Sequence, residues 1–215
     1  DEIDVIIKGH TGYYCAGMNQ NAFVTINGNV GTGVAENMMS GKVHVKGNAS
    51  QSAGATAHGG LLIIDGDASS RCGISMKGVD IVVKGSVGHM CAFMAQAGNV
   101  LICGDAGEAL GDSIYETEIY VKGKVKSLGA DCVEKKLEEK HKMIIKNLLE
   151  KSGLCFLNLF HNELFHLLVH FLPVMYFENI HLPFNLCINT IIEAKSSTHD
   201  IQLHRGGARN RTKGL

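Results

Sequence analysis

The chain has 215 residues, and its 20 Lys and Arg nearly balance 21 Asp and Glu, which leaves a formal net charge of −1. This balance argues against a nucleic-acid or polyanion binder, because such proteins usually carry a basic excess. Aromatic residues make up 6% and Trp is absent, so we expect no platform for stacking bases or sugars. With 26 Gly, 2 Pro and 45% hydrophobic residues, the composition excludes collagen and a disordered linker, and predicts a fold with many tight corners.

The cysteines predict the redox environment of the chain. There are seven, an odd number, and none are paired in a C-x-x-C spacing. We therefore expect reduced thiols in a cytoplasmic protein rather than a secreted disulfide framework. The chain starts at Asp1 without a signal peptide or an initiator Met, and we expect a fragment with residues missing upstream.

A repeat of 19 residues organises the first part of the chain. Each unit contains a short apolar segment that ends in glycine, as in VHVKG and IVVKG. The residues four and two positions before the glycine are apolar and mostly β-branched, which predicts a strand with one inward face. The glycine predicts a corner where a side chain or a negative φ would be costly. These corner glycines are Gly9, Gly28, Gly47, Gly66, Gly85, Gly104 and Gly123.

A second column of the repeat contains only the two smallest residues. Seven positions after the corner, every unit has Ala or Gly, which predicts a tight inner corner. A helix is excluded because each Gly would cost roughly 1 kcal/mol in a helix interior. Antiparallel hairpins fit poorly, because the same strand recurs in the same direction. We therefore predict an all-β fold over residues 1–133, a right-handed parallel β-helix of seven coils that is stabilised by stacking.

One polar column is expected to face solvent. Directly before the corners, Lys alternates with other residue types, so that Asp65 is predicted to lie between Lys46 and Lys84. This order avoids like-charge neighbours on adjacent strands. The alternative interpretation of this column is an anion-binding stripe.

The pattern changes near residue 134. Residues 134–152 contain neither Pro nor Gly, and Gly153 follows them. Residues 134–153 therefore predict an amphipathic helix that ends at Gly153 and caps the exposed edge of the last coil. Its apolar face would consist of Leu137, Ile144, Ile145, Leu148 and Leu149.

The remaining tail, residues 154–215, shares nothing with the repeat, and we predict that it is poorly packed or disordered. A reading-frame accident is an alternative origin. Residues 154–176 are mostly apolar, but polar residues interrupt this segment and Pro173 would break a helix within it. We therefore expect no membrane span.

Three patterns could carry chemistry, and each has a structural explanation. His161, His166 and His170 could bind a metal, but they have no clear further ligand. Cys15, Cys72 and Cys91 share one column and could serve redox or iron–sulfur chemistry, but this column is otherwise apolar and predicts core packing. Glycine pairs that suggest phosphate loops are explained by the repeat. We therefore predict no catalytic, cofactor-binding or metal-binding residue in this chain.

The repeat resembles the GXGXG domain, the C-terminal β-helix of the glutamate synthase large subunit, which is also found as a separate subunit of formylmethanofuran dehydrogenase. The segment IYVKGKVKSLGADCVEKKLEEKHKMIIKNLLEKSG, residues 119–153, is most similar to the stand-alone glutamate synthase-like subunits, including the N-methylglutamate synthase type. The resemblance covers residues 1–153. The chain departs from the family in its tail, because such subunits usually end soon after the helix.

This resemblance implies a non-catalytic structural subunit in a glutamate synthase-like complex. It implies that FMN and an iron–sulfur cluster belong to a partner synthase subunit and that a glutaminase-type subunit is a second partner. The composition and hydropathy predict, separately, that neither nucleic acid nor a membrane is a partner. Two alternatives remain, the GXGXG-type subunit of formylmethanofuran dehydrogenase and a stand-alone polysaccharide-active β-helix enzyme. The latter class places acidic or basic residues along one groove, whereas the acidic residues here are scattered over the columns.

Overall fold

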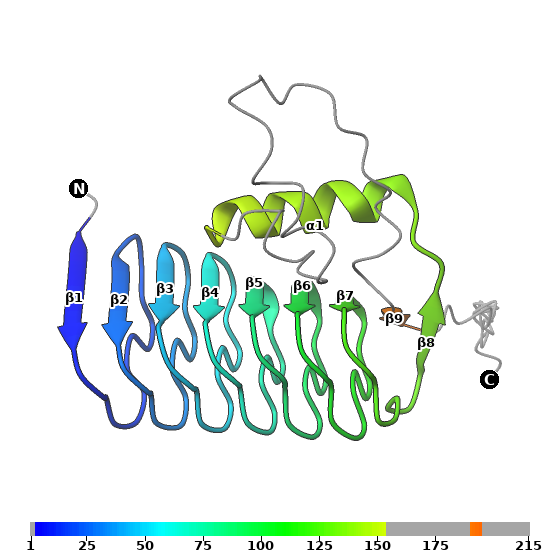
Figure 1. Ribbon diagram of the computed structural model, residues 1–215, viewed down its shortest axis with the longest axis horizontal. Helices are drawn as coiled ribbons and strands as arrows, with labels where there is room; N and C mark the ends of the chain where they lie inside the picture. The colour runs from blue at the N-terminus through cyan, green and yellow to red at the C-terminus, as the bar shows by residue number, and fades with distance from the viewer. Residues whose placement is uncertain (1–2, 154–189, 195–215) are drawn as a thin grey trace, which may run out of the picture.

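The computed structural model describes residues 3–153 and 190–194, and it is a parallel β-solenoid with one helix on its flank (Figure 1). Six successive parallel pairings join seven strands, each placed one repeat after the last. Val24, for example, pairs with Val5 on one side and with Val43 on the other. The predicted parallel β-helix is therefore confirmed. The strands are β1 (Asp4–Lys8), β2 (Phe23–Asn27), β3 (Lys42–Val45), β4 (Leu61–Ile64), β5 (Lys77–Val83), β6 (Ala97–Ile102) and β7 (Glu116–Val121).

The inward column of each strand fills the interior of the solenoid. Ile26, Val45, Ile64, Val83 and Ile102 occupy the same position in five successive coils and have no exposed surface. A second line of contacts runs along the column two residues after each corner, where parallel bridges link Thr11 to Val125 through every intervening coil. Because each coil buries its apolar face only against its neighbours, the fold is stabilised by repetition.

A ladder of side-chain oxygens runs along the position that follows each corner glycine. The Asn29 Oδ1 accepts a hydrogen bond of 2.8 Å from the backbone N–H of Asn48, whose own Oδ1 accepts one of 2.9 Å from the N–H of Asp67. The ladder continues through the side chains of Asp67, Ser86 and Asp105 to the N–H of Lys124. Each side chain thus satisfies a backbone donor in the next coil, at a turn where the strand ladder has ended.

The corner glycines are required for close approach rather than for an unusual φ. Only Gly9 among them has a positive φ, of 116°, so the predicted conformational reason is wrong for the other six. A Cβ on Gly66 would instead overlap the Oδ1 of Asn48 and lie 3.0 Å from the carbonyl oxygen of Gly47. The ladder and the preceding corner therefore leave no room for a side chain.

The column of Ala and Gly has a conformational cause that the repeat pattern did not reveal. Six of its seven members adopt a left-handed backbone, with φ between 55° and 70°. Left-handed φ disfavours bulky and β-branched residues, and the interior position removes space as well. Ala35 and Ala92 are fully buried, for example. The members are Ala16, Ala35, Gly54, Gly73, Ala92 and Gly111.

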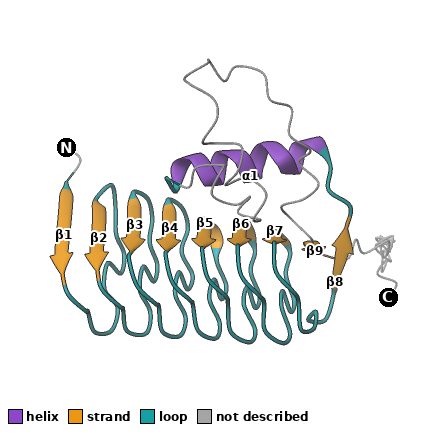
Figure 2. Ribbon diagram, viewed as in Figure 1, coloured by secondary structure: helices purple, strands orange, loops and turns teal. Residues whose placement is uncertain are grey.

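Helix α1 (Glu139–Lys151) lies along the outer face of the sheet and runs from β8 back toward β3 (Figure 2). Its buried residues Ile145, Leu148 and Leu149 pack on outward side chains of β4 to β7. The helix ends as predicted, because Gly153 has a φ of 69° and its N–H donates to the carbonyl of Glu150. The outward side chains beneath α1 are Leu61, Ile63, Val82, Leu101 and Tyr120.

The predicted helix is therefore present, but its bounds and its position differ from the prediction. The chain first forms β8 (Cys132–Lys135), and β9 (Thr190–Ala194) inserts antiparallel between β7 and β8. These two strands, and not the helix, continue the sheet beyond the last coil. The row of parallel neighbours ends here because β9 runs antiparallel to both β7 and β8, and β8 is the edge strand of the sheet.

Part of the tail contradicts the prediction that all of it is poorly packed. Strand β9 belongs to the segment 154–215, and its residue Ile192 is fully buried in the solenoid core. The other residues of the segment, including 154–176, lie outside the described residues. Within the described part of the chain, no helix has the length and apolar character needed to cross a bilayer.

The close approach at the corners predicts a difference between two glycine substitutions. Gly66→Ala should lower the free energy of unfolding by about 1–3 kcal/mol, because its Cβ overlaps fixed backbone and ladder atoms. Gly12→Ala is the matched control, since nothing lies within 4 Å of its Cβ and its φ is not positive. It should leave stability unchanged or raise it by up to ~1 kcal/mol. Urea unfolding followed by circular dichroism measures both, and equal effects would contradict this explanation.

The oxygen ladder predicts a stability loss from a single amide. Asn48→Ala removes the acceptor for the Asp67 N–H and should lower the free energy of unfolding by about 1–2 kcal/mol. Asn147→Ala, at an exposed position of α1, is the control and should change stability little. A loss at Asn48 no larger than at Asn147 would show that water replaces the ladder without penalty.

Candidate functional site

Asp65 lies at the centre of a charged cluster on the outer face of the sheet. Its Oδ1 accepts hydrogen bonds from Lys84 Nζ at 2.7 Å and from His44 Nε2 at 2.9 Å. Lys46 Nζ lies 3.6 Å from its other oxygen. The predicted position of Asp65 between two lysines is thus confirmed. Because Lys46 and Lys84 share this carboxylate, their charges are partly neutralised within the column, which disfavours an anion-binding stripe at these two positions.

The environment of this cluster shifts two titrations. Burial lowers the pKa of His44, although its hydrogen bond to Asp65 acts in the opposite direction. Burial raises the pKa of Asp65, but the hydrogen bonds from Lys84 and His44 outweigh it and leave this pKa below its usual value. Neutral His44 therefore donates its Nε2–H to an ionised Asp65.

Two members of the shared cysteine column lie in the core, as the apolar character of that column predicts, and the third, Cys15, is half-buried against it. Cys72 and Cys91, on adjacent coils, have no exposed surface. Their mutual hydrogen bond and their burial raise the pKa of Cys91 well above its usual range. Cys103 is also affected, because burial raises its pKa to about 11. Thiols held in this form are poor nucleophiles and poor metal ligands, since both roles require the thiolate.

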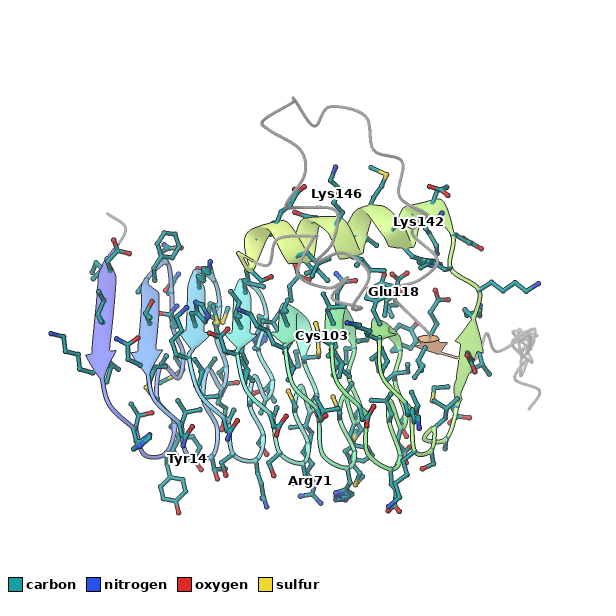
Figure 3. The ribbon with its side chains drawn as sticks, in the orientation of Figure 1. Tyr14, Arg71, Cys103, Glu118, Lys142 and Lys146 are labelled. Atoms are coloured by element: carbon teal, nitrogen blue, oxygen red, sulfur yellow. The ribbon has the colours of Figure 1, made fainter. Side chains whose placement is uncertain are left out.

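A second polar cluster lies where α1, β7 and β9 meet, and sequence reasoning missed it. Its residues are Glu118 and Tyr120 of β7, His141 of α1 and Glu193 of β9. Glu118 lies beneath the beginning of the helix (Figure 3). The Tyr120 hydroxyl donates a hydrogen bond to Glu118, and burial together with this bond raises the pKa of Tyr120. These residues are distant in sequence, and Glu193 lies in the tail, so no local motif could have revealed the cluster.

His141 is the most confined member of this cluster. Its exposed fraction is 1%, and its Nδ1 accepts a hydrogen bond of 2.9 Å from the backbone N–H of Glu138 at the start of the helix. Its Nε2 lies 3.3 Å from Glu193 Oε1 but makes no hydrogen bond. Lys140 Nζ lies at 3.7 Å from Glu118 and 4.0 Å from Glu193. The cluster therefore contains two carboxylates, a half-satisfied imidazole and a distant ammonium group.

The histidines His161, His166 and His170 lie outside the described residues. The glycines that suggested phosphate loops lie at coil corners, where the N–H of Gly31, for example, donates to the carbonyls of Thr11 and Gly12. Those backbone donors are used between coils and do not converge on a ligand.

His44 predicts how stability depends on pH. Because its pKa is lowered in the folded state, the unfolded chain binds the proton more readily. The free energy of unfolding should therefore fall as pH drops below about 6.5, and Asp65 should add a further loss only at more acidic pH. His44→Gln should remove the first loss and keep the second. Unfolding curves recorded at a series of pH values, from neutral to acidic, test this. A variant whose free energy of unfolding depends on pH as the parent's does would contradict it.

Comparison with known proteins gives one informative similarity. The chain is 70% identical over 148 residues to Protein GlxC of Rhizobium meliloti (strain 1021). The matched region is 69% of this chain and 65% of the relative, so the chain spans just under two thirds of the length of that protein. No family model matches the chain.

Proposed function

We propose that this chain is a non-catalytic structural subunit of a glutamate synthase-like complex, which forms glutamate or N-methylglutamate with ammonia from glutamine. The similarity to Protein GlxC covers 69% of this chain, which is most of the region where the resemblance to glutamate synthase-like subunits lies. The parallel solenoid is also the architecture that the resemblance to the GXGXG domain implies. FMN and an iron–sulfur cluster would belong to a partner synthase subunit, and a glutaminase-type subunit would be the second partner.

The observation that carries the non-catalytic role is how the repeat uses its reactive side chains. Cys72 and Cys91 contact each other inside the core, and the Asp67 carboxylate accepts a backbone N–H from the next coil. Asp65 and Glu108 are paired with lysines. These groups stabilise contacts between coils or with neighbouring side chains, so they do not converge on one groove. This arrangement disfavours the polysaccharide-active alternative, which needs free carboxylates along a cleft.

The distribution of exposed apolar side chains supports an assembly role. Among the described residues, Tyr13, Tyr14 and Met18 are large hydrophobic side chains of one turn, and each is more than half exposed. Tyr13 and Met18 are 76% and 74% exposed. Exposed apolar side chains gathered in one turn are typical of a protein–protein contact.

Co-purification from the native host tests the proposal. A tagged chain should recover an FMN- and iron–sulfur-containing subunit together with a glutaminase-type subunit, whereas the chain expressed alone should contain neither flavin nor an iron–sulfur cluster. Recovery of a molybdenum or tungsten subunit would instead support the formylmethanofuran dehydrogenase alternative. Stoichiometric flavin in the isolated chain would contradict a non-catalytic role.

The exposed apolar side chains predict where a partner contacts the chain. The double variant Tyr13→Ser with Met18→Ser should recover at least tenfold less partner, because truncated hot-spot residues commonly cost about 2 kcal/mol of binding. Met143→Ser removes an equally exposed side chain from α1 and is the control, since Met143 is 74% exposed. Equal recovery with both variants would place the contact elsewhere.

A further inference from the structure

We propose that Glu118, His141 and Glu193 form a binding site for a divalent transition-metal ion of the Zn²⁺ class. The ion would join three elements, because these residues come from β7, α1 and β9. Its role would be structural, holding the helix and the tail strand on the solenoid. This inference does not depend on the proposed function.

The three ligand atoms lie close together, and short side-chain movements would bring all of them to coordination distance of one ion. One donor atom from each residue lies within 4.8 Å of the other two. His141 Nε2 and Glu193 Oε1 lie 3.3 Å apart, but the two groups are not oriented for a hydrogen bond. This separation matches the edge of a tetrahedron around zinc, because ligands at about 2.0–2.1 Å from the metal lie about 3.3 Å apart.

The imidazole of His141 is the independent sign that a ligand belongs here. Its side chain is 2% exposed, and among the residues that the structure describes its Nε2 has no hydrogen-bond partner, yet this atom faces the carboxylate of Glu193. A buried polar atom without a partner is destabilising, so native structures rarely retain one. A metal ion between Nε2 and the two carboxylates would satisfy it.

The donor set selects the class of ion. An imidazole with two carboxylates suits Zn²⁺, Mn²⁺ or Fe²⁺, whereas Ca²⁺ and Mg²⁺ prefer oxygen ligands alone. Three protein ligands would leave a fourth position for water. The side chains of Glu118 and Glu193 are 22% and 20% exposed, so an ion can reach the site from solvent.

The bound proton must leave when the ion enters. Since the Glu138 N–H donates to Nδ1, the proton of the neutral His141 ring is on Nε2. When the ion binds the Nε2 lone pair, this proton is exchanged through solvent for one on Nδ1, so the ring stays neutral. Nδ1 then faces the Glu138 N–H donor to donor, and the hydrogen bond at the helix start opens. Metal binding and this capping bond therefore compete, and hydrogen exchange of the Glu138 amide should become faster when the ion binds.

Lys140 lies beside the site, and its ammonium group would compete with the ion for the two carboxylates. Lys140 Nζ lies within 4.0 Å of both carboxylates, where its charge partly occupies the place of the ion. Lys140→Met should therefore tighten Zn²⁺ binding. A cluster with a purely structural role predicts only a loss of stability from the same change, and no effect on zinc.

The experiment is a calorimetric titration of the metal-free full chain with Zn²⁺, together with Co²⁺ absorption spectroscopy to report coordination. We expect one ion per chain at this site, and at least about tenfold weaker binding in each of Glu118→Gln, His141→Gln and Glu193→Gln. Circular dichroism melting of the metal-free variants shows that they are folded.

Two controls locate the bound ion. Glu108→Gln changes a carboxylate outside the cluster, which is paired with Lys126, and should bind like the parent. The triple variant in which His161, His166 and His170 become Gln should also keep this binding. The proposal is overturned if the parent shows no saturable binding, if His141→Gln binds as tightly as the parent, or if the triple variant loses the ion.

Discussion

Close stacking of successive corners is the steric constraint on which the solenoid depends. At Gly66, the carbonyl oxygen of Gly47 and the side-chain oxygen of Asn48 occupy the space where a Cβ would be. The same Asn48 satisfies the backbone N–H of Asp67 in the next coil. Register and hydrogen bonding therefore depend on the same atoms. An insertion of one residue between corners would displace both, which explains why the spacing of 19 is maintained from Gly9 to Gly123.

The outer face of the sheet is specialised along its length. In the middle column of the strands, β4 to β7 present Ile63, Val82, Leu101 and Tyr120, which α1 covers. In β3 the same column has His44, which binds Asp65 instead of an apolar helix face. The column is apolar where α1 covers the sheet and polar at His44, where the residue pairs with Asp65 instead. The mixed composition of this column is therefore explained by the position of the helix.

The polar cluster under the start of α1 links three segments that are far apart in the sequence. His141 connects to the helix start through Nδ1 and faces the tail strand through Nε2. An assembly subunit needs a rigid body whose parts keep their positions, and such a junction contributes to this rigidity. The proposed ion would strengthen it, whereas the repeat itself already uses its polar groups between coils.

The 19-residue repeat was enough to predict the solenoid, its register and the core columns, because a strict repeat makes distant residues equivalent and stacking then follows. The helix that ends at Gly153 was predicted from its amphipathic pattern and the glycine that follows it. The folded chain was needed to show that α1 covers the flank, that β9 inserts between β7 and β8, and that Glu118 meets His141 and Glu193. These contacts join segments with no shared period. The left-handed backbone of the Ala and Gly column also emerged only in three dimensions, since small size alone does not distinguish lack of space from an unusual φ.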